Sequence, residues 1–223
     1  MSSSDQLPPS GFVRRGFLVV ISGPSGVGKT SFCAHLLETR NDTVRSISAT
    51  TRPPRPGEES GRDYFFDGPE AFEARKQAGE FLEYAEVHGQ GYGTPRRFVE
   101  EAIEQGKIVL LNIDVQGGLA IKAGHPDGVY IFVYPPSLDS LRARLEARSQ
   151  DDGAEIARRM ANAPGEMRRW REYDYVVVNE DLATALSQVS AIVEAERARV
   201  GRLVPKGSQG VLQGGVGSKR EGP

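Results

Sequence analysis

The chain has 223 residues, a formal net charge of −2 and 26% charged residues. This length suits one α/β domain with insertions and is too short for two independent hydrophobic cores. The near-neutral balance gives no overall attraction to nucleic acid or to an anionic membrane, and the sequence has neither an apolar run of about 18 residues nor the pattern of a secretion signal.

The two ends of the chain are rich in Ser, Gly and Pro and poor in large apolar residues. Residues 1–15 and 203–223 therefore cannot bury enough surface to offset the entropy of ordering, and we expect both to be disordered. Residues 16–202 are expected to form a single domain. Two polar segments interrupt its pattern, an insertion at about 48–94 and a lid at about 146–166.

Four short apolar runs predict buried strands, because they alternate with stretches of helical periodicity. These runs are residues 17–21, 108–113, 129–133 and 175–178. The helical stretches between and after them include residues 32–37, 138–145 and 182–193. This alternation predicts an α/β fold with a parallel sheet flanked by helices, in which ligands bind at the carboxyl ends of the strands.

The first predicted strand leads directly into GPSGVGKT at residues 23–30, which fits the phosphate-loop pattern G-x-x-x-x-G-K-[ST]. Its glycines let several backbone N–H groups converge on an anion at the amino end of the next helix. Lys29 is predicted to contact the outer phosphates, and the Thr30 hydroxyl to ligate Mg²⁺. The residues predicted to bind the nucleoside triphosphate are Gly23, Pro24, Ser25, Gly26, Val27, Gly28, Lys29, Thr30 and Ser31.

The single cysteine, Cys33, falls in the helix after this loop and cannot form a disulfide within the chain. A buried, reduced thiol predicts a cytoplasmic protein. The three histidines, His35, His88 and His125, are far apart and have no cysteine neighbours, so we expect no structural zinc site.

The insertion carries Arg52 and Arg55 on a segment stiffened by prolines, and Tyr64 follows in an aromatic cluster. Because prolines restrict the backbone before a ligand arrives, two guanidinium groups held there can bind a phosphate bidentately at a low entropic cost. These residues by themselves leave a second interpretation open, a pair of solvated surface arginines.

Several segments together resemble the guanylate kinases, a family of phosphate-loop nucleoside monophosphate kinases. They are GPSGVGKT, SATTRPPRPGE, DYFF, FLEYAEVHGQGYGT, LNIDVQG, YPPS, VVVNED and an arginine-bearing lid. Each is weak alone, but their order and separations from residue 16 to about 200 are specific to the family. The resemblance implies the fold of those kinases, with an inserted GMP-binding subdomain and a lid.

The resemblance also implies a reaction, in which the γ-phosphoryl group of ATP is transferred to GMP or dGMP with Mg²⁺ bound. It implies no obligate protein partner. Arg148 and Arg159 of the lid would act in catalysis together with Lys29. The GMP-binding residues that it implies are Ser48, Arg52, Arg55, Tyr64, Glu83, Tyr92, Thr94 and Asp114.

The chemistry of guanine supports the role of Glu83 independently. An ionised carboxylate can accept from both the N1–H and the 2-amino group of guanine, whereas adenine presents an acceptor at N1 and leaves the carboxylate unpaired. The hydroxyls of Ser48 and Thr94 can donate to the guanine O6. Considered alone, Glu83 is more typical of a solvated surface carboxylate than of a ligand-binding group.

Three features depart from the family pattern. Asn112 stands where many relatives carry an acidic residue, and the loss of that charge weakens the expected metal site. Tyr92 lies between two glycines, whereas the family often has a second tyrosine beside it. Pro164 interrupts an expected helix, so a kink or break is predicted near Ala163. Arg144 shares a helix face with Arg148 and is open between a site role and a surface role.

Two other functions remain open at this stage. The first is a kinase of the same architecture that acts on another phosphorylated acceptor, which Glu83, Ser48 and Thr94 argue against. The second is a scaffolding module of this fold that binds phosphopeptides without turnover. Such modules typically lose the phosphate-loop lysine, and this chain retains Lys29.

Overall fold

The computed structural model describes residues 11–87, 89–147 and 153–205. A central sheet of five parallel strands runs in the order β10, β9, β2, β8, β3. Its strands are β2 (Phe17–Ser22), β3 (Thr43–Arg45), β8 (Ile108–Asn112), β9 (Val129–Tyr134) and β10 (Tyr175–Val178). The predicted α/β class and all four predicted strands are confirmed, and β3 is a strand that the apolar pattern missed.

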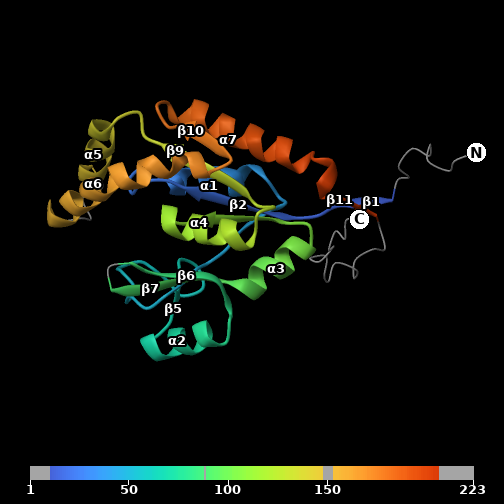
Figure 1. Ribbon diagram of the computed structural model, residues 1–223, viewed down its shortest axis with the longest axis horizontal. Helices are drawn as coiled ribbons and strands as arrows, with labels where there is room; N and C mark the ends of the chain where they lie inside the picture. The colour runs from blue at the N-terminus through green and yellow to red at the C-terminus, as the bar shows by residue number, and fades with distance from the viewer. Residues whose placement is uncertain (1–10, 88, 148–152, 206–223) are drawn as a thin grey trace, which may run out of the picture.

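Helices cover both faces of this sheet (Figure 1). Side chains of β2 alternate between two cores, because successive residues of a strand point to opposite faces. Val19 and Ile21 pack with α1 (Lys29–Thr39) and α7 (Leu182–Arg197). Leu18 and Val20 pack on the other face with α3 (Arg96–Glu104) and α4 (Val115–Gly124). Among the described residues, no helix is both long enough and apolar enough to cross a bilayer.

The insertion forms a second sheet, which projects from the α4 side of the domain (Figure 1). Its strands run in the order β5 (Phe65–Phe66), β4 (Ala49–Thr50), β7 (Gln90–Pro95) and β6 (Phe81–Val87). Helix α2 (Pro69–Gln77) closes the subdomain, and Phe72 stacks on Phe81 with ring centroids 4.8 Å apart. A small core of its own therefore holds the insertion together.

The ends of the described chain differ from the prediction. Strand β1 (Phe12–Arg14) pairs antiparallel with β11 (Leu203–Pro205), so disorder was the wrong expectation for these residues. Each strand supplies backbone partners for the other, and the adjacent Arg202 guanidinium lies 4.2 Å from the centroid of the Phe17 ring. Composition does not reveal a pairing between opposite ends of a chain. Residues 1–10 and 206–223 lie outside the described residues.

Of the kink or break predicted near Ala163, the break is wrong. Helix α6 (Gly153–Arg168) is continuous with Pro164 inside it, and it packs against α5 (Leu138–Glu146). Ala163 is 1% exposed and Met160 packs against the same core. Packing of this turn against the domain therefore outweighs the hydrogen bond that the proline ring removes.

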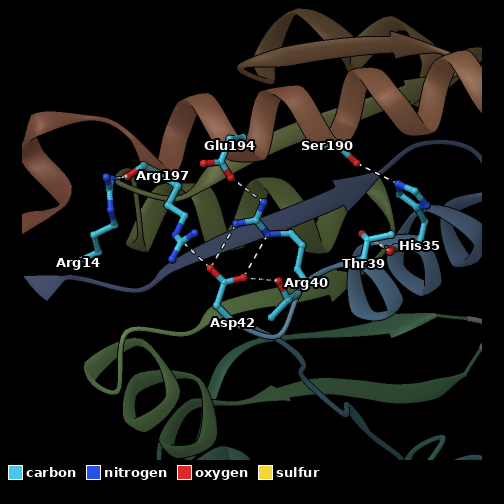
Figure 2. Close-up of polar contacts among 9 residues, drawn as sticks. Arg14, His35, Thr39, Arg40, Asp42, Ser190, Glu194 and Arg197 are labelled. Carbon is cyan, nitrogen blue, oxygen red and sulfur yellow. Dashed lines mark hydrogen bonds and ion pairs between the residues drawn. The ribbon is translucent and has the colours of Figure 1, made fainter.

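A network of ion pairs ties α7 to the end of α1 (Figure 2). Arg40 donates to both carboxylate oxygens of Asp42 at 3.2 Å each and to Glu194 at 2.8 Å. Arg197 lies 3.0 Å from the same Asp42 carboxylate. Burial disfavours the charged form of Asp42, but the hydrogen bonds and charge of Arg40 and the charge of Arg197 outweigh it and lower the pKa of Asp42.

We expect the Asp42→Asn variant to lose about 1–2 kcal/mol of unfolding free energy at pH 7, because two arginines lose a charged acceptor. A lowered folded-state pKa means that this contribution is complete above about pH 4 and is lost as the pH falls through the folded-state pKa. Urea unfolding of both proteins at pH 7 and pH 3 measures the difference, which should shrink at the lower pH. Glu38→Gln, an exposed carboxylate on α1, is the matched control and should change stability by less than about 0.5 kcal/mol.

Candidate active site

Most of the predicted acceptor-site residues, and several of the phosphate loop, line two adjoining cavities at the carboxyl ends of β2 and β8. A cavity of about 480 Å³ lies between the phosphate loop, the insertion and α6, and one of about 190 Å³ lies between the insertion and the start of α4. Tyr64, Tyr92 and Asp114 line both. A larger cavity of about 840 Å³ lies at the opposite edge of the sheet and contains none of the predicted site residues.

The phosphate loop leaves β2 through glycines in left-handed conformations. Gly23, Gly26 and Gly28 have φ values of 147°, 87° and 105°. A Cβ atom on Gly23 would lie 2.3 Å from the Val133 carbonyl oxygen of β9, so no other residue fits there without moving backbone. Helix α1 then begins at Lys29 with no side-chain cap, which leaves its first amide groups to an anion.

Two side chains of α1 lie at the mouth of the loop. Lys29 Nζ donates to the carbonyl oxygens of Gly23 at 2.7 Å and Pro24 at 3.1 Å, so its ammonium group folds over the loop. Thr30 Oγ1 accepts from Asn112 Nδ2 at 3.4 Å. Asn112, which departs from the family pattern, thus lies beside the predicted metal ligand.

Two residues hold the loop from behind: Arg144, whose role the sequence left open, and Asn179, which was not singled out. Asn179 Nδ2 and Arg144 Nη1 donate to the same Val27 carbonyl oxygen, at 2.8 Å and 3.3 Å. Because C=O and N–H point in opposite directions across a trans peptide, this directs the Gly28 N–H to the other side. Arg144 Nη2 also donates to the Asn179 carbonyl at 2.8 Å. The available signal was the polar Asn179-Glu180-Asp181 segment directly after a buried strand.

The lid contributes Arg159 from α6. Its Nη1 donates to Ser25 Oγ at 2.8 Å and its Nε to Glu155 at 2.8 Å, so α6 already contacts the phosphate loop. Glu166 of the same helix lines the larger of the two adjoining cavities, and burial raises its pKa against the opposing effect of Lys29. Arg148 lies outside the described residues.

The four predicted phosphate ligands of the insertion all line the 480 Å³ cavity; they are Arg52, Arg55, Tyr64 and Tyr92. The Arg52 guanidinium lies 5.0 Å from the centroid of the Tyr64 ring, and Tyr64 meets Tyr92 edge to face with centroids 6.1 Å apart. Arg52 also donates to both carboxylate oxygens of Glu58 at 2.7 Å. Glu58 is a second residue that sequence reasoning did not single out.

Three of the four residues predicted to bind guanine line the 190 Å³ cavity, namely Ser48, Glu83 and Asp114. The fourth, Thr94, is fully buried and its hydroxyl donates to Glu83 Oε1 at 2.8 Å instead of lining the cavity. Asp114 Oδ1 accepts from the Gly117 N–H at 2.8 Å and caps α4. In this structure Thr94 therefore orients the carboxylate, and one Asp114 oxygen has a structural role.

Glu83 is the most perturbed carboxyl group of this cavity. Burial raises its pKa to about 7; the Thr94 hydrogen bond opposes the shift and the Asp114 charge adds to it. A Cβ atom on Gly117 would lie 3.3 Å from Glu83 Oε2, so the carboxylate sits close against the first turn of α4. Near neutral pH this group is poised between its two forms, and a ligand that presents two donors would favour the ionised one.

Comparison with known proteins agrees with the geometry. Residues 15–196 match the guanylate kinase family model. The guanylate kinase of Symbiobacterium thermophilum is 49% identical over 188 residues, which cover 84% of this chain and 89% of that protein. That of Thermotoga maritima is also 49% identical over 188 residues, with 84% and 91% covered.

A crystal structure of guanylate kinase from Anaplasma phagocytophilum shares 36% sequence identity and superposes with a TM-score of 0.71. The match covers 86% of this chain and 92% of that chain. Family model, relatives and fold agree with the resemblance seen in the sequence segments. The chain therefore belongs to the guanylate kinase family, whose members are phosphotransferase enzymes.

Proposed function

We propose that the protein transfers the γ-phosphoryl group of ATP to GMP or dGMP, giving ADP and GDP or dGDP. One observation carries the proposal: residues of the phosphate loop and a second cluster of arginine and tyrosine side chains suited to phosphate line the same 480 Å³ cavity. A carboxylate pocket of the kind that reads guanine adjoins the second cluster. A donor and an acceptor nucleotide could therefore meet end to end between them.

On the donor side, the amides of the phosphate loop and the start of α1 would bind the ATP phosphates. Lys29 would leave the carbonyl groups of Gly23 and Pro24 and turn to the β- and γ-phosphates. Arg159, which lies against Ser25, would neutralise charge on the transferring group. Arg148 is proposed for the same task.

On the acceptor side, Arg52, Arg55, Tyr64 and Tyr92 would bind the phosphate of GMP, while Glu83 reads the base. The nucleophile is a phosphate oxygen that is already anionic, so the chemistry needs no strong general base. Catalysis then consists of alignment, charge neutralisation and exclusion of water.

We propose Mg²⁺, bound with ATP, as the cofactor. The residues present fit such an ion, because the Thr30 hydroxyl is an oxygen ligand and the Asn112 amide lies 3.4 Å from it. When bound, the ion would neutralise charge on the β- and γ-phosphates. Asn112 can hydrogen-bond a metal-bound water but supplies no negative charge, so the phosphates would provide most of the attraction.

We expect Lys29→Ala to lower kcat by at least about 100-fold, because a positive charge at the transferring phosphoryl group is lost. The measurement is GMP-dependent formation of ADP from ATP by the purified protein. Lys76→Ala, which removes a lysine ion-paired with Glu73 on α2, is the matched control and should retain wild-type activity. Equal activity of the Lys29 variant and the control would contradict the proposed donor site.

Base selectivity tests the acceptor site. Initial rates with GMP, AMP, CMP and UMP should favour GMP strongly, and Glu83→Gln should raise the KM for GMP by about 10- to 100-fold through loss of a charged acceptor. Ser48→Ala should have a smaller effect, because it removes a neutral donor. Comparable rates with all four nucleotides would overturn the guanine assignment.

The raised pKa of Glu83 predicts a pH dependence. Only the ionised carboxylate accepts from both guanine donors, so affinity should fall by about tenfold for each pH unit below the pKa of about 7 and level off above it. Calorimetric titration with guanosine between pH 5.5 and 8 isolates this group, since guanosine lacks the phosphate that itself titrates near pH 6. Glu83→Gln should give a flat profile, and a wild-type profile that is equally flat would count against the role of Glu83.

A further inference from the structure

The turn that carries the two insertion arginines contains an ion pair that the proposed reaction does not use. Glu58 accepts from Arg52 Nη1 through one carboxylate oxygen and from Nη2 through the other, each at 2.7 Å. The two side chains are only 11% and 20% exposed. This pair is therefore better shielded from water than an ordinary surface salt bridge.

The bonds of Arg52 use one end of its guanidinium. Nη1 donates to Glu58 and also to the Pro53 carbonyl at 2.9 Å, and Nη2 donates to Glu58. A guanidinium has a second fork, formed by Nε–H and the remaining Nη2–H, which matches two phosphate oxygens. Tyr92, which lines the 480 Å³ cavity, also hydrogen-bonds to the same guanidinium.

Glu58 also fixes the backbone of the second arginine. Its Oε2 accepts from the Arg55 N–H at 2.8 Å, and its own N–H donates to the Arg55 carbonyl at 3.0 Å. The three prolines of the turn have no N–H to donate. One carboxylate thus holds the side chain of Arg52 and the backbone of Arg55 in the same arrangement.

The position of the pair relative to the cavity shows which way it faces. Arg52 and Arg55 line the 480 Å³ cavity, and Glu58 is not among its lining residues. The Arg52 guanidinium is further held between aromatic rings, 5.0 Å from the centroid of Tyr64 and 5.6 Å from that of Phe66. The carboxylate therefore lies behind the arginine, away from the space where a phosphate would bind.

We propose that Glu58 is a positioning residue for the acceptor phosphate, holding one fork of Arg52 so that the other faces the cavity. The inference rests on the proposed GMP site. Arg52 lowers the pKa of Glu58 to about 2, so the carboxylate stays charged at any working pH. In the opposite arrangement Glu58 would be a substitute anion that the phosphate displaces, and its removal would then strengthen binding.

The test compares Glu58→Ala and Glu58→Gln with the wild-type protein in steady-state kinetics and ligand titration. We expect the KM for GMP to rise about tenfold or more in Glu58→Ala, with the KM for ATP changed less than about twofold. Glu58→Gln keeps a single acceptor, so its KM for GMP should lie between those of the wild-type protein and Glu58→Ala. Affinity for guanosine should be unchanged in both, because guanosine has no phosphate for Arg52 to bind.

Matched variants separate this role from a general effect on the insertion. Glu59→Ala removes the neighbouring carboxylate, which is 69% exposed and paired with Arg62, and it should leave the KM for GMP unchanged. In an Arg52→Ala background, Glu58→Ala should add only a smaller further loss, because only its effect on the Arg55 backbone remains.

Three results would overturn the inference. A lower KM for GMP in Glu58→Ala would identify Glu58 as a competing anion. An equal loss of GMP and guanosine affinity would mean that the residue only supports the fold of the insertion, and an unchanged KM would mean that Arg52 needs no second anchor. Failure of the proposed function itself is distinct, because the wild-type protein would then show no GMP-dependent formation of ADP.

Discussion

The site depends on how closely the phosphate loop approaches the central sheet. Strand β2 lies in the middle of five parallel strands, and the chain must turn away from it close to the backbone of β9. A Cβ atom added to Gly23 would lie only 2.3 Å from the Val133 carbonyl oxygen of β9. That contact admits only glycine. The bonds of Asn179 and Arg144 to the Val27 carbonyl oxygen then fix the next peptide and direct the Gly28 N–H to the other side.

Two carboxylates of the insertion have very different pKa values because their surroundings differ. Glu58 is paired with Arg52 and its pKa falls to about 2, so it is a permanent anion that organises a cation. Glu83 is desolvated beside Asp114 and its pKa rises to about 7, so a ligand with two donors can shift its ionisation. The difference follows from burial and from the nearest partner, which is a guanidinium for Glu58 and a single hydroxyl for the buried Glu83.

Much of the fold was predictable because the central strands are continuous apolar runs and the phosphate loop has a nearly unique spacing. The predictions failed where distant parts of the chain meet. Strands β1 and β11 lie near opposite ends of the sequence and pair with each other. The packing of Ala163 keeps α6 continuous through Pro164. Composition and local propensity describe neighbours along the chain, so they miss stabilisation that comes from residues far away in it.

For the site, the sequence alone determined the chemical inventory on which the proposed function rests: a loop proposed for the ATP phosphates, arginines and tyrosines proposed for a second phosphate, and a carboxylate proposed for guanine. Only the tertiary structure decided how these groups are supported. It turned Thr94 toward Glu83, engaged Asp114 as the cap of α4, and placed Glu58 behind Arg52. The reason is that a motif specifies which atoms are available, whereas hydrogen-bond direction, burial and pKa depend on what the fold brings within a few ångströms of them.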